Sequence, residues 1–263
     1  MTDQCLRVER PSDGVLQLTF ALPERRNAMT TELTSAWVQA VADVAADRTV
    51  RAVVVTGEGS AFCAGGDLSW LAESPDMTVS DLRDRMLPFY RSWLAVRDLE
   101  VPVIAAVNGP AIGAGLCVAL ACDIRYASTE ATFSAPFVRL GIHAGMAATF
   151  LLPEAVGVPR ARELLLTGRR VDAEEALRIG LCEAVHPPER LLEEALATAG
   201  QIAANAPVAV RLTKAALAFA GHRSIAEALA WEGVAQPVTM ATEDLLEGIA
   251  AQGERRTPRF TGR

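Results

Sequence analysis

The chain of 263 residues lacks the features that mark several classes of protein. No apolar run reaches the ~20 residues that a membrane helix needs, and no run of Lys or Arg is longer than a pair such as Arg255-Arg256. With a net charge of −7, we expect neither a nucleic-acid nor a membrane partner. The five cysteines contain no C-x-x-C pair, which favours reduced core thiols over a disulfide framework or a zinc site, and no metal is expected. They are Cys5, Cys63, Cys117, Cys122 and Cys182.

Signals for export and for nucleotide binding are also missing. No N-terminal segment combines a charged start, an apolar core and a cleavage site, so we expect a cytoplasmic protein. The G-x-G at Gly113 and Gly115 has Val118 where a dinucleotide fingerprint has its third glycine. A G-K-[ST] phosphate loop does not occur in the sequence. These absences argue against a dinucleotide-binding or P-loop enzyme.

Hydrophobic periodicity predicts strands alternating with helices in the first part of the chain. Gly14–Phe20 alternates as a half-buried strand does, and Val50–Thr56 is a nearly continuous apolar run typical of a central strand. Asp81–Leu99 is predicted as a long helix that is interrupted near Pro88. After Gly145 the pattern becomes almost wholly helical. The sequence therefore predicts an α/β core followed by an α-helical C-terminal part.

The stretch Val101–Asp123 reads as a strand, a tight glycine turn and a buried helix. This arrangement leaves unpaired backbone N–H groups at the helix start, where they favour an anion or a polarised carbonyl oxygen. A second glycine turn, Ala64–Asp67, follows another apolar strand. Two such donors converging on one point would form an oxyanion hole. The alternative is that both turns need glycine for their geometry alone.

Several motifs in order along the chain resemble the crotonase superfamily, the enoyl-CoA hydratase/isomerase group. They are Pro23–Ala28 (PERRNA), Phe62–Leu68 (FCAGGDL), Pro102–Asp123, Leu140-Gly141, Leu166–Gly168, Ala176 with Gly180-Leu181, and Ala241–Gly248. The resemblance implies an α/β fold of the ClpP/crotonase type: a spiral of ββα units with a C-terminal α-helical trimerisation region. By this resemblance we assign residues 1–200 to the spiral core with its acyl-CoA site and residues 201–263 to oligomerisation.

The resemblance also implies acyl-CoA thioester substrates, a role in fatty-acid metabolism, and a homotrimer or a dimer of trimers. Coenzyme A would be part of the substrate, and no separate cofactor is expected. By position, the N–H groups of Gly66 and Ala114 would hold the thioester oxygen, although the family usually has glycine where Ala114 stands. The residues expected to contact the thioester or its CoA portion are Arg25, Ala64, Gly66, Asp67, Leu68 and Ala114. For Asp67, a cap on the following helix is favoured over proton transfer.

Two departures from the family pattern concern the reaction. Hydratases of the family use two glutamates, and at those positions this chain has Cys117 and Phe137. Phenylalanine cannot transfer a proton, and Cys117 is interpreted as a small buried hydrophobe. His143 is a candidate acid or base because imidazole exchanges protons near neutral pH, but it could equally be a structural loop residue. Ordinary hydration is therefore in doubt.

The sequence thus predicts an acyl-CoA lyase or isomerase that stabilises a thioester enolate. Isomerisation, another lyase step and weak hydration all remain open. One alternative is an acyl-CoA-binding protein that has lost its chemistry. A more remote alternative is a thioester hydrolase, in which a nucleophile or an activated water attacks the polarised carbonyl.

Overall fold

The computed structural model describes residues 5–67, 76–218 and 224–263. Its main feature is a six-stranded sheet in the order β1-β2-β3-β4-β6-β9, in which only the β1–β2 pair is antiparallel. The strands are β1 (Leu6–Ser12), β2 (Val15–Phe20), β3 (Ala52–Gly57), β4 (Val103–Val107), β6 (Ile124–Ser128) and β9 (Ala184–His186). A second, three-stranded sheet contains β5 (Ala111–Ile112), β7 (Thr132–Ser134) and β8 (Arg170–Asp172).

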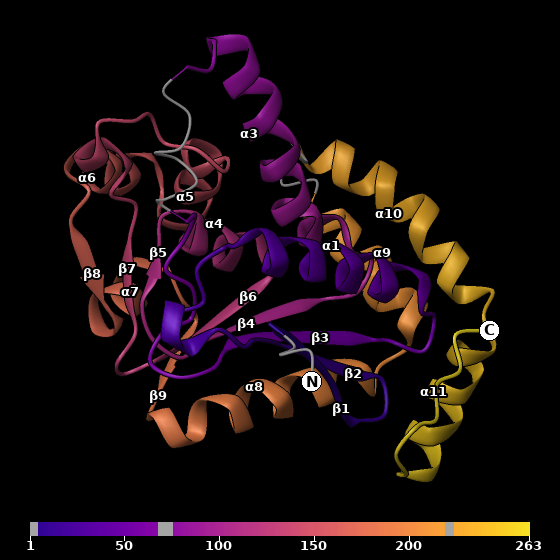
Figure 1. The fold of residues 1–263 in the computed structure, drawn as a ribbon. Helices are drawn as coiled ribbons and strands as arrows, with labels where there is room; N and C mark the ends of the chain where they lie inside the picture. Colours follow the sequence, from indigo (N-terminus) through magenta and orange to yellow (C-terminus); the bar gives the residue numbers. More distant parts are fainter. Residues whose placement is uncertain (1–4, 68–75, 219–223) are drawn as a thin grey trace.

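Helices cover both faces of the main sheet (Figure 1). They are α1 (Thr31–Ala46), α3 (Val79–Leu94), α4 (Ala114–Ala121), α5 (Ala148–Val156), α6 (Val158–Thr167), α7 (Ala173–Ile179), α8 (Pro188–Ala203), α9 (Pro207–Ala218), α10 (Ile225–Met240) and α11 (Glu243–Glu254). Three 3₁₀ turns span Pro23–Arg25, Ala95–Asp98 and Phe137–Leu140. None of the described helices is both long and apolar enough to cross a bilayer.

The central strands are buried on both faces, as their continuous apolar runs predict. In β3, Val53 and Val55 face the larger core with α1, α3 and α4, while Ala52 and Val54 pack toward α8. In the larger core, the Trp37 ring stacks on the Trp93 ring with their centroids 5.3 Å apart, and the tilted Phe20 ring lies 5.4 Å from Trp37. This packing fixes the carboxyl ends of the parallel strands, where the two glycine turns begin.

Local signals in the sequence account for many helix ends. The side chain of Thr30 accepts a hydrogen bond from the Leu33 N–H at the start of α1, and Thr78 forms a capping box with Asp81 at the start of α3. The Asp172 side chain likewise caps α7, where it accepts a hydrogen bond from the Glu175 N–H at 2.8 Å.

The predicted α/β core with a helical C-terminal part is confirmed, but the element predictions needed corrections. Helix α3 is not interrupted at Pro88, which lies inside it. Residue 84, whose carbonyl loses its helical hydrogen bond there, is exposed, so water can replace the missing donor. The short strands β8 and β9 lie in a region predicted to be almost wholly helical. Each gains its stability from a neighbouring strand rather than from its own three residues.

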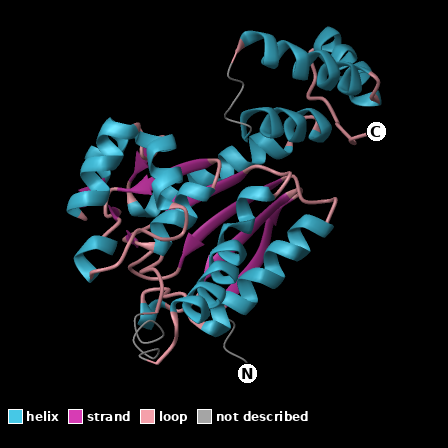
Figure 2. Ribbon diagram, turned by 90° about the horizontal axis from the view of Figure 1, so that it is seen from above, coloured by secondary structure: helices cyan, strands magenta, loops and turns pink. Residues whose placement is uncertain are grey.

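The helices α9–α11 lie to one side of the body, with the C-terminus among them (Figure 2). One buried charge ties α9 to the core: Lys214 Nζ donates to the Val101 carbonyl at 2.8 Å and to Asp123 at 2.7 Å. Helix α10 contains no buried residue among those described. Much of the surface of the C-terminal helices is therefore not covered by the rest of the chain.

Candidate active site

The two glycine turns meet because their backbones pair. Cys63, in the loop after β3, forms an isolated parallel bridge with Ala111 of β5. The Cys63 N–H donates to the Pro110 carbonyl at 3.1 Å, and the Ile112 N–H donates to the Cys63 carbonyl at 3.0 Å. The turn at Ala64–Asp67 is thereby held directly against the turn that precedes α4.

Glycine is required at three positions of these turns. Gly65 has φ +94°, and a Cβ there would lie 2.5 Å from the Ile112 carbonyl oxygen. Gly113 has φ +56° and ψ −116°, a conformation that L side chains rarely adopt. A Cβ on Gly115 would lie 2.2 Å from the Cys63 carbonyl oxygen, so only glycine allows the two chains this approach.

The two glycines with positive φ, Gly65 and Gly113, each precede one predicted oxyanion donor. Gly65 precedes Gly66, and Gly113 precedes Ala114, the first residue of α4, whose N–H has no acceptor within the helix. Among residues 5–67, 76–218 and 224–263, neither N–H has a hydrogen-bond acceptor. Ala114 itself does not have a positive φ, so alanine fits without strain where the family usually has glycine.

Both donors line one cavity of about 100 Å³, whose walls are mostly apolar. Its described lining comes from the two turns, from α3 and from the loop between β7 and α5. The residues are Ala64, Gly65, Gly66, Met86, Phe89, Tyr90, Ile112, Gly113, Ala114, Pro136, Phe137, Leu140, Ile142, His143, Gly145 and Met146. A carboxylate does not occur among these described lining residues. The cavity thus combines backbone donors with an apolar wall.

Cys117 lies one helical turn beyond Ala114 and is fully buried. Its Sγ is 3.9 Å from the Gly145 carbonyl oxygen, and it is not among the lining residues of the cavity. Burial raises the pKa of the Cys117 thiol to about 12. It is therefore neither a base nor a nucleophile at neutral pH, in agreement with its interpretation as a small buried hydrophobe.

Phe137 opens the 3₁₀ turn Phe137–Leu140 and forms part of the cavity wall, with 9% of its surface exposed. The edge of its ring faces Gly113, since a Cβ on that glycine would lie 3.9 Å from two ring carbons. The ring therefore fills the space beside the hole with an apolar group. No proton can be exchanged from this position.

His143 is on the cavity rim and is exposed to solvent. Its Nδ1 lies 2.8 Å from the Ala144 carbonyl oxygen. Because a carbonyl only accepts, this contact favours the tautomer that carries its proton on Nδ1 and leaves Nε2 with a free lone pair. The structure thus presents an imidazole with one nitrogen suited to accept a proton.

Arg25, predicted to contact CoA, forms an ion pair with Asp67 at 2.5 Å. The pair links the turn Pro23–Arg25 to the residue that follows Gly66. The helix cap predicted for Asp67 would involve the next residues, which together with the predicted contact residue Leu68 lie outside the described part of the chain. Ala64 is held nearby, because its N–H donates to the Arg26 carbonyl at 2.9 Å.

Sequence reasoning missed two residues at this site. Asn27 is fully buried, and its amide donates to the carbonyls of Glu58 at 3.0 Å and Ala61 at 2.8 Å, which fixes the loop that leads to the first glycine turn. Tyr90 reaches the cavity from α3. Its only signal in the sequence is its rarity, since the chain has two tyrosines.

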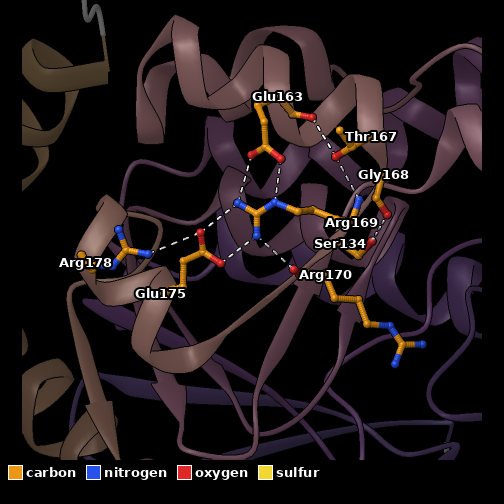
Figure 3. A network of polar contacts seen from close by, with 8 residues as sticks. All are labelled: Ser134, Glu163, Thr167, Gly168, Arg169, Arg170, Glu175 and Arg178. Carbon is orange, nitrogen blue, oxygen red and sulfur yellow. Dashed lines mark hydrogen bonds and ion pairs between the residues drawn. The ribbon is translucent and has the colours of Figure 1, made fainter.

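A charged network braces the segment that carries Phe137 (Figure 3). The Arg169 guanidinium lies between two carboxylates, at 2.6 Å and 2.9 Å from Glu163 and at 2.7 Å and 2.8 Å from Glu175. Hydrogen bonds from Arg169 lower the pKa of both carboxyl groups. Ser134 adds a bond from its Oγ to the Gly168 carbonyl at 3.1 Å. The network fixes the β7–β8 pair next to the cavity.

Comparison with known proteins agrees with this geometry. Residues 10–263 match the family described as Enoyl-CoA hydratase/isomerase. A (E)-benzylidenesuccinyl-CoA hydratase of Thauera aromatica is 38% identical over 258 residues, which cover 95% of this chain and 97% of that one. A 2,3-dehydroadipyl-CoA hydratase of Escherichia coli is 36% identical over 250 residues, 95% of this chain and 96% of that one.

A solved structure shares the whole fold. The crystal structure of an enoyl-CoA hydratase from Bacillus anthracis matches with a TM-score of 0.93 at 35% identity, and the match covers 99% of this chain and all of that chain. The predicted crotonase-type fold is therefore confirmed. With its paired glycine turns and its helical C-terminal part, the chain belongs to the enoyl-CoA hydratase/isomerase family of enzymes.

Proposed function

We propose that the protein acts on acyl-CoA thioesters through an enolate whose oxygen is held by the N–H groups of Gly66 and Ala114. The observation that supports this most directly is that both free N–H groups follow left-handed glycines and line one apolar cavity. An enolate places negative charge on the thioester oxygen, and fixed backbone dipoles stabilise that charge without reorganising. The apolar wall strengthens the effect because it excludes water.

The acid–base chemistry in this proposal depends on His143. A free Nε2 lone pair at the cavity rim could remove a proton from Cα, and the resulting imidazolium could return it to another carbon of the acyl chain. On an unsaturated acyl chain this transfer of one proton between two carbons moves the double bond, which is an isomerisation. Water addition normally needs a base and an acid held close together, and neither Cys117 nor Phe137 supplies one. We therefore expect hydration of crotonyl-CoA to be slow.

The CoA portion is proposed to lie against the turn Pro23–Arg25, with coenzyme A entering only as part of the substrate. Arg25 supports this placement because its side chain is half exposed and pairs with Asp67, the residue after the proposed donor Gly66. Its pairing with Asp67 orients the guanidinium but leaves it solvated, so that a phosphate could share it.

The proposed assembly is a homotrimer or a dimer of trimers built through residues 201–263. Large apolar side chains remain exposed along α10 and α11, and this apolar surface supports an interface. The most exposed are Ile225, Leu229, Val234, Leu246 and Ile249. Light scattering coupled to size exclusion tests the assembly, and a monomer at micromolar concentration would contradict it.

One observation favours a second candidate function, an acyl-CoA-binding protein without catalysis. Among the described residues, no carboxylate lines the cavity, and its one imidazole is on the rim. The thioester hydrolase, by contrast, gains no support, because the Cys117 thiol is buried behind the cavity wall.

A panel of saturated and unsaturated acyl-CoAs separates these functions. Binding is read from the shift in thermal unfolding temperature, because a ligand that prefers the native state stabilises it. Turnover is read by mass spectrometry, with exchange of the Cα proton in D₂O as the measure of enolate formation. The enzyme proposal predicts exchange that is lost in His143→Ala. Binding without exchange would establish the second candidate, and no thermal shift with any thioester would refute both.

A further inference from the structure

Tyr90 gives the cavity its only described side-chain hydroxyl. The side chain comes from α3 and crosses to the opposite wall, where it lies directly against Gly145. A Cβ on Gly145 would be 2.4 Å from the Tyr90 Oη and 2.9 Å from its Cζ. Residue 145 must therefore be glycine for the hydroxyl to occupy this place. Among the described residues, the hydroxyl has no hydrogen-bond partner.

The same glycine also contacts Cys117. The Cys117 Sγ lies 3.9 Å from the Gly145 carbonyl oxygen, so Tyr90 and Cys117 reach Gly145 from two different helices. Burial, and then the nearby Cys117, raise the pKa of Tyr90 above its usual range. The phenol therefore stays neutral around pH 7 and can donate a hydrogen bond. The Tyr90 hydroxyl, a hydrogen-bond donor from α3, thus lies near the apolar side chain of Cys117 on α4.

The position of this donor relative to the hole follows from helix geometry. Residue 117 is three positions after Ala114, so both lie on one face of α4 with Cβ atoms roughly 5–6 Å apart. An acyl chain that runs from the Ala114 N–H along this face of α4 would bring its third carbon toward Gly145 and the Tyr90 hydroxyl, which line the same cavity. Resting on the function proposed above, we propose that Tyr90 donates a hydrogen bond to an oxygen on Cβ, so that the site selects 3-oxygenated acyl-CoAs.

The test compares two ligands that differ by one oxygen, 3-hydroxybutyryl-CoA and butyryl-CoA, by isothermal titration calorimetry. In Tyr90→Phe, the dissociation constant of the 3-hydroxy compound should rise roughly 2- to 12-fold, the effect of one neutral hydrogen bond, while that of butyryl-CoA changes less than twofold. The chain's other tyrosine is the matched control. Tyr126 bonds through its hydroxyl to Thr198 of α8 at 3.1 Å and is not a lining residue of the cavity, so Tyr126→Phe should leave both constants unchanged.

A second variant acts on the same hydroxyl from the other side. Gly145→Ala places a methyl where the Tyr90 hydroxyl lies and should remove the preference for the 3-hydroxy compound as Tyr90→Phe does. If Tyr90→Phe weakens both ligands equally, or neither, the inference is overturned while the acyl-CoA function stands. If the unaltered protein binds neither thioester, the proposed function itself fails.

Discussion

The N–H group of Ala114 can be removed without taking any side chain away from the cavity. Proline lacks the backbone N–H and is favoured at the first position of a helix, which is the position of Ala114 in α4. The residue before a proline avoids the right-handed helical region, and Gly113 lies outside it at φ +56° and ψ −116°. Ala114→Pro should therefore keep the turn while it deletes one of the two proposed oxyanion donors.

The expected effect is large and specific to the reacting charge. Loss of one oxyanion-hole donor typically lowers kcat by a factor of roughly 10²–10³, or about 2.7–4 kcal/mol of transition-state stabilisation. The assay is the rate of Cα proton exchange, or of turnover, on the thioester that the panel shows to be best. Because the donor acts mainly on the developing oxyanion, kcat should fall far more than KM changes.

Ala173→Pro is the matched control, since Ala173 is the first residue of α7 and follows Asp172, whose extended backbone at ψ 176° tolerates a following proline. This control should keep its rate within about twofold, because no described residue of α7 lines the cavity that holds the proposed donors. Both variants should unfold at temperatures close to that of the unaltered protein. Normal kcat in a folded Ala114→Pro variant would show that this N–H does not hold the thioester oxygen.

Three further predictions concern the surroundings of the hole. Cys117→Glu combined with Phe137→Glu should raise the slow rate of crotonyl-CoA hydration, which is followed by absorbance and compared with each single variant. The buried carboxylate should lower the unfolding temperature. Fast hydration by the unaltered protein would mean that the catalytic positions are misassigned. Gly115→Ala should lower the unfolding free energy by roughly 1–3 kcal/mol in urea titrations, because its Cβ meets a backbone oxygen at 2.2 Å. Gly200→Ala, with open space in a helix, should instead raise it by about 0.5–1 kcal/mol, and equal effects would refute the packing argument. Arg169→Gln should cost up to about 1 kcal/mol at pH 7, since its partners are partly exposed. Folding lowers the pKa values of its two carboxyl partners. The difference in unfolding free energy between the variant and the unaltered protein should therefore be full above about pH 4.3 and shrink as the pH falls further. A difference that does not depend on pH would exclude the ion pairs as its source.

The sequence was informative where local chemistry decides the structure. Val50–Thr56 and Val103–Val107 are apolar enough to be central strands in any context, and glycines between such strands and a buried helix leave few conformations open. By contrast, the strand Ala184–His186 depends on pairing with Tyr126–Ser128, more than fifty residues earlier. Three residues carry too little periodicity to predict such a partner.

In the candidate site, too, some residues can be predicted from local motifs and others depend on contacts between distant segments. The motifs indicated Gly66 and Ala114 as donors, a role that stays a prediction, and the structure places both residues on one cavity because their position depends on the backbone of their own turns. Tyr90 could not be placed, since its contribution depends on how α3 crosses the molecule. Asn27 was missed for a similar reason: its amide bonds to carbonyls more than thirty residues away. Contacts between distant segments leave no local pattern in the sequence.

Substrate class and reaction are physically separable in this site. The proposed oxyanion donors are backbone groups, and the backbone pairing of Cys63 with Ala111 and the glycines beside it hold them in place. None of that support involves the side chain of Cys117 or Phe137. With a thiol and a phenyl ring at the positions where hydratases of the family use glutamates, the two glycine turns keep their geometry, and the protein avoids the desolvation that a buried carboxylate would cost. In the proposed function, such a site keeps its capacity to hold a thioester oxygen, while His143 as the proposed acid or base determines which reaction can follow and Tyr90 as the proposed hydrogen-bond donor selects the acyl chain.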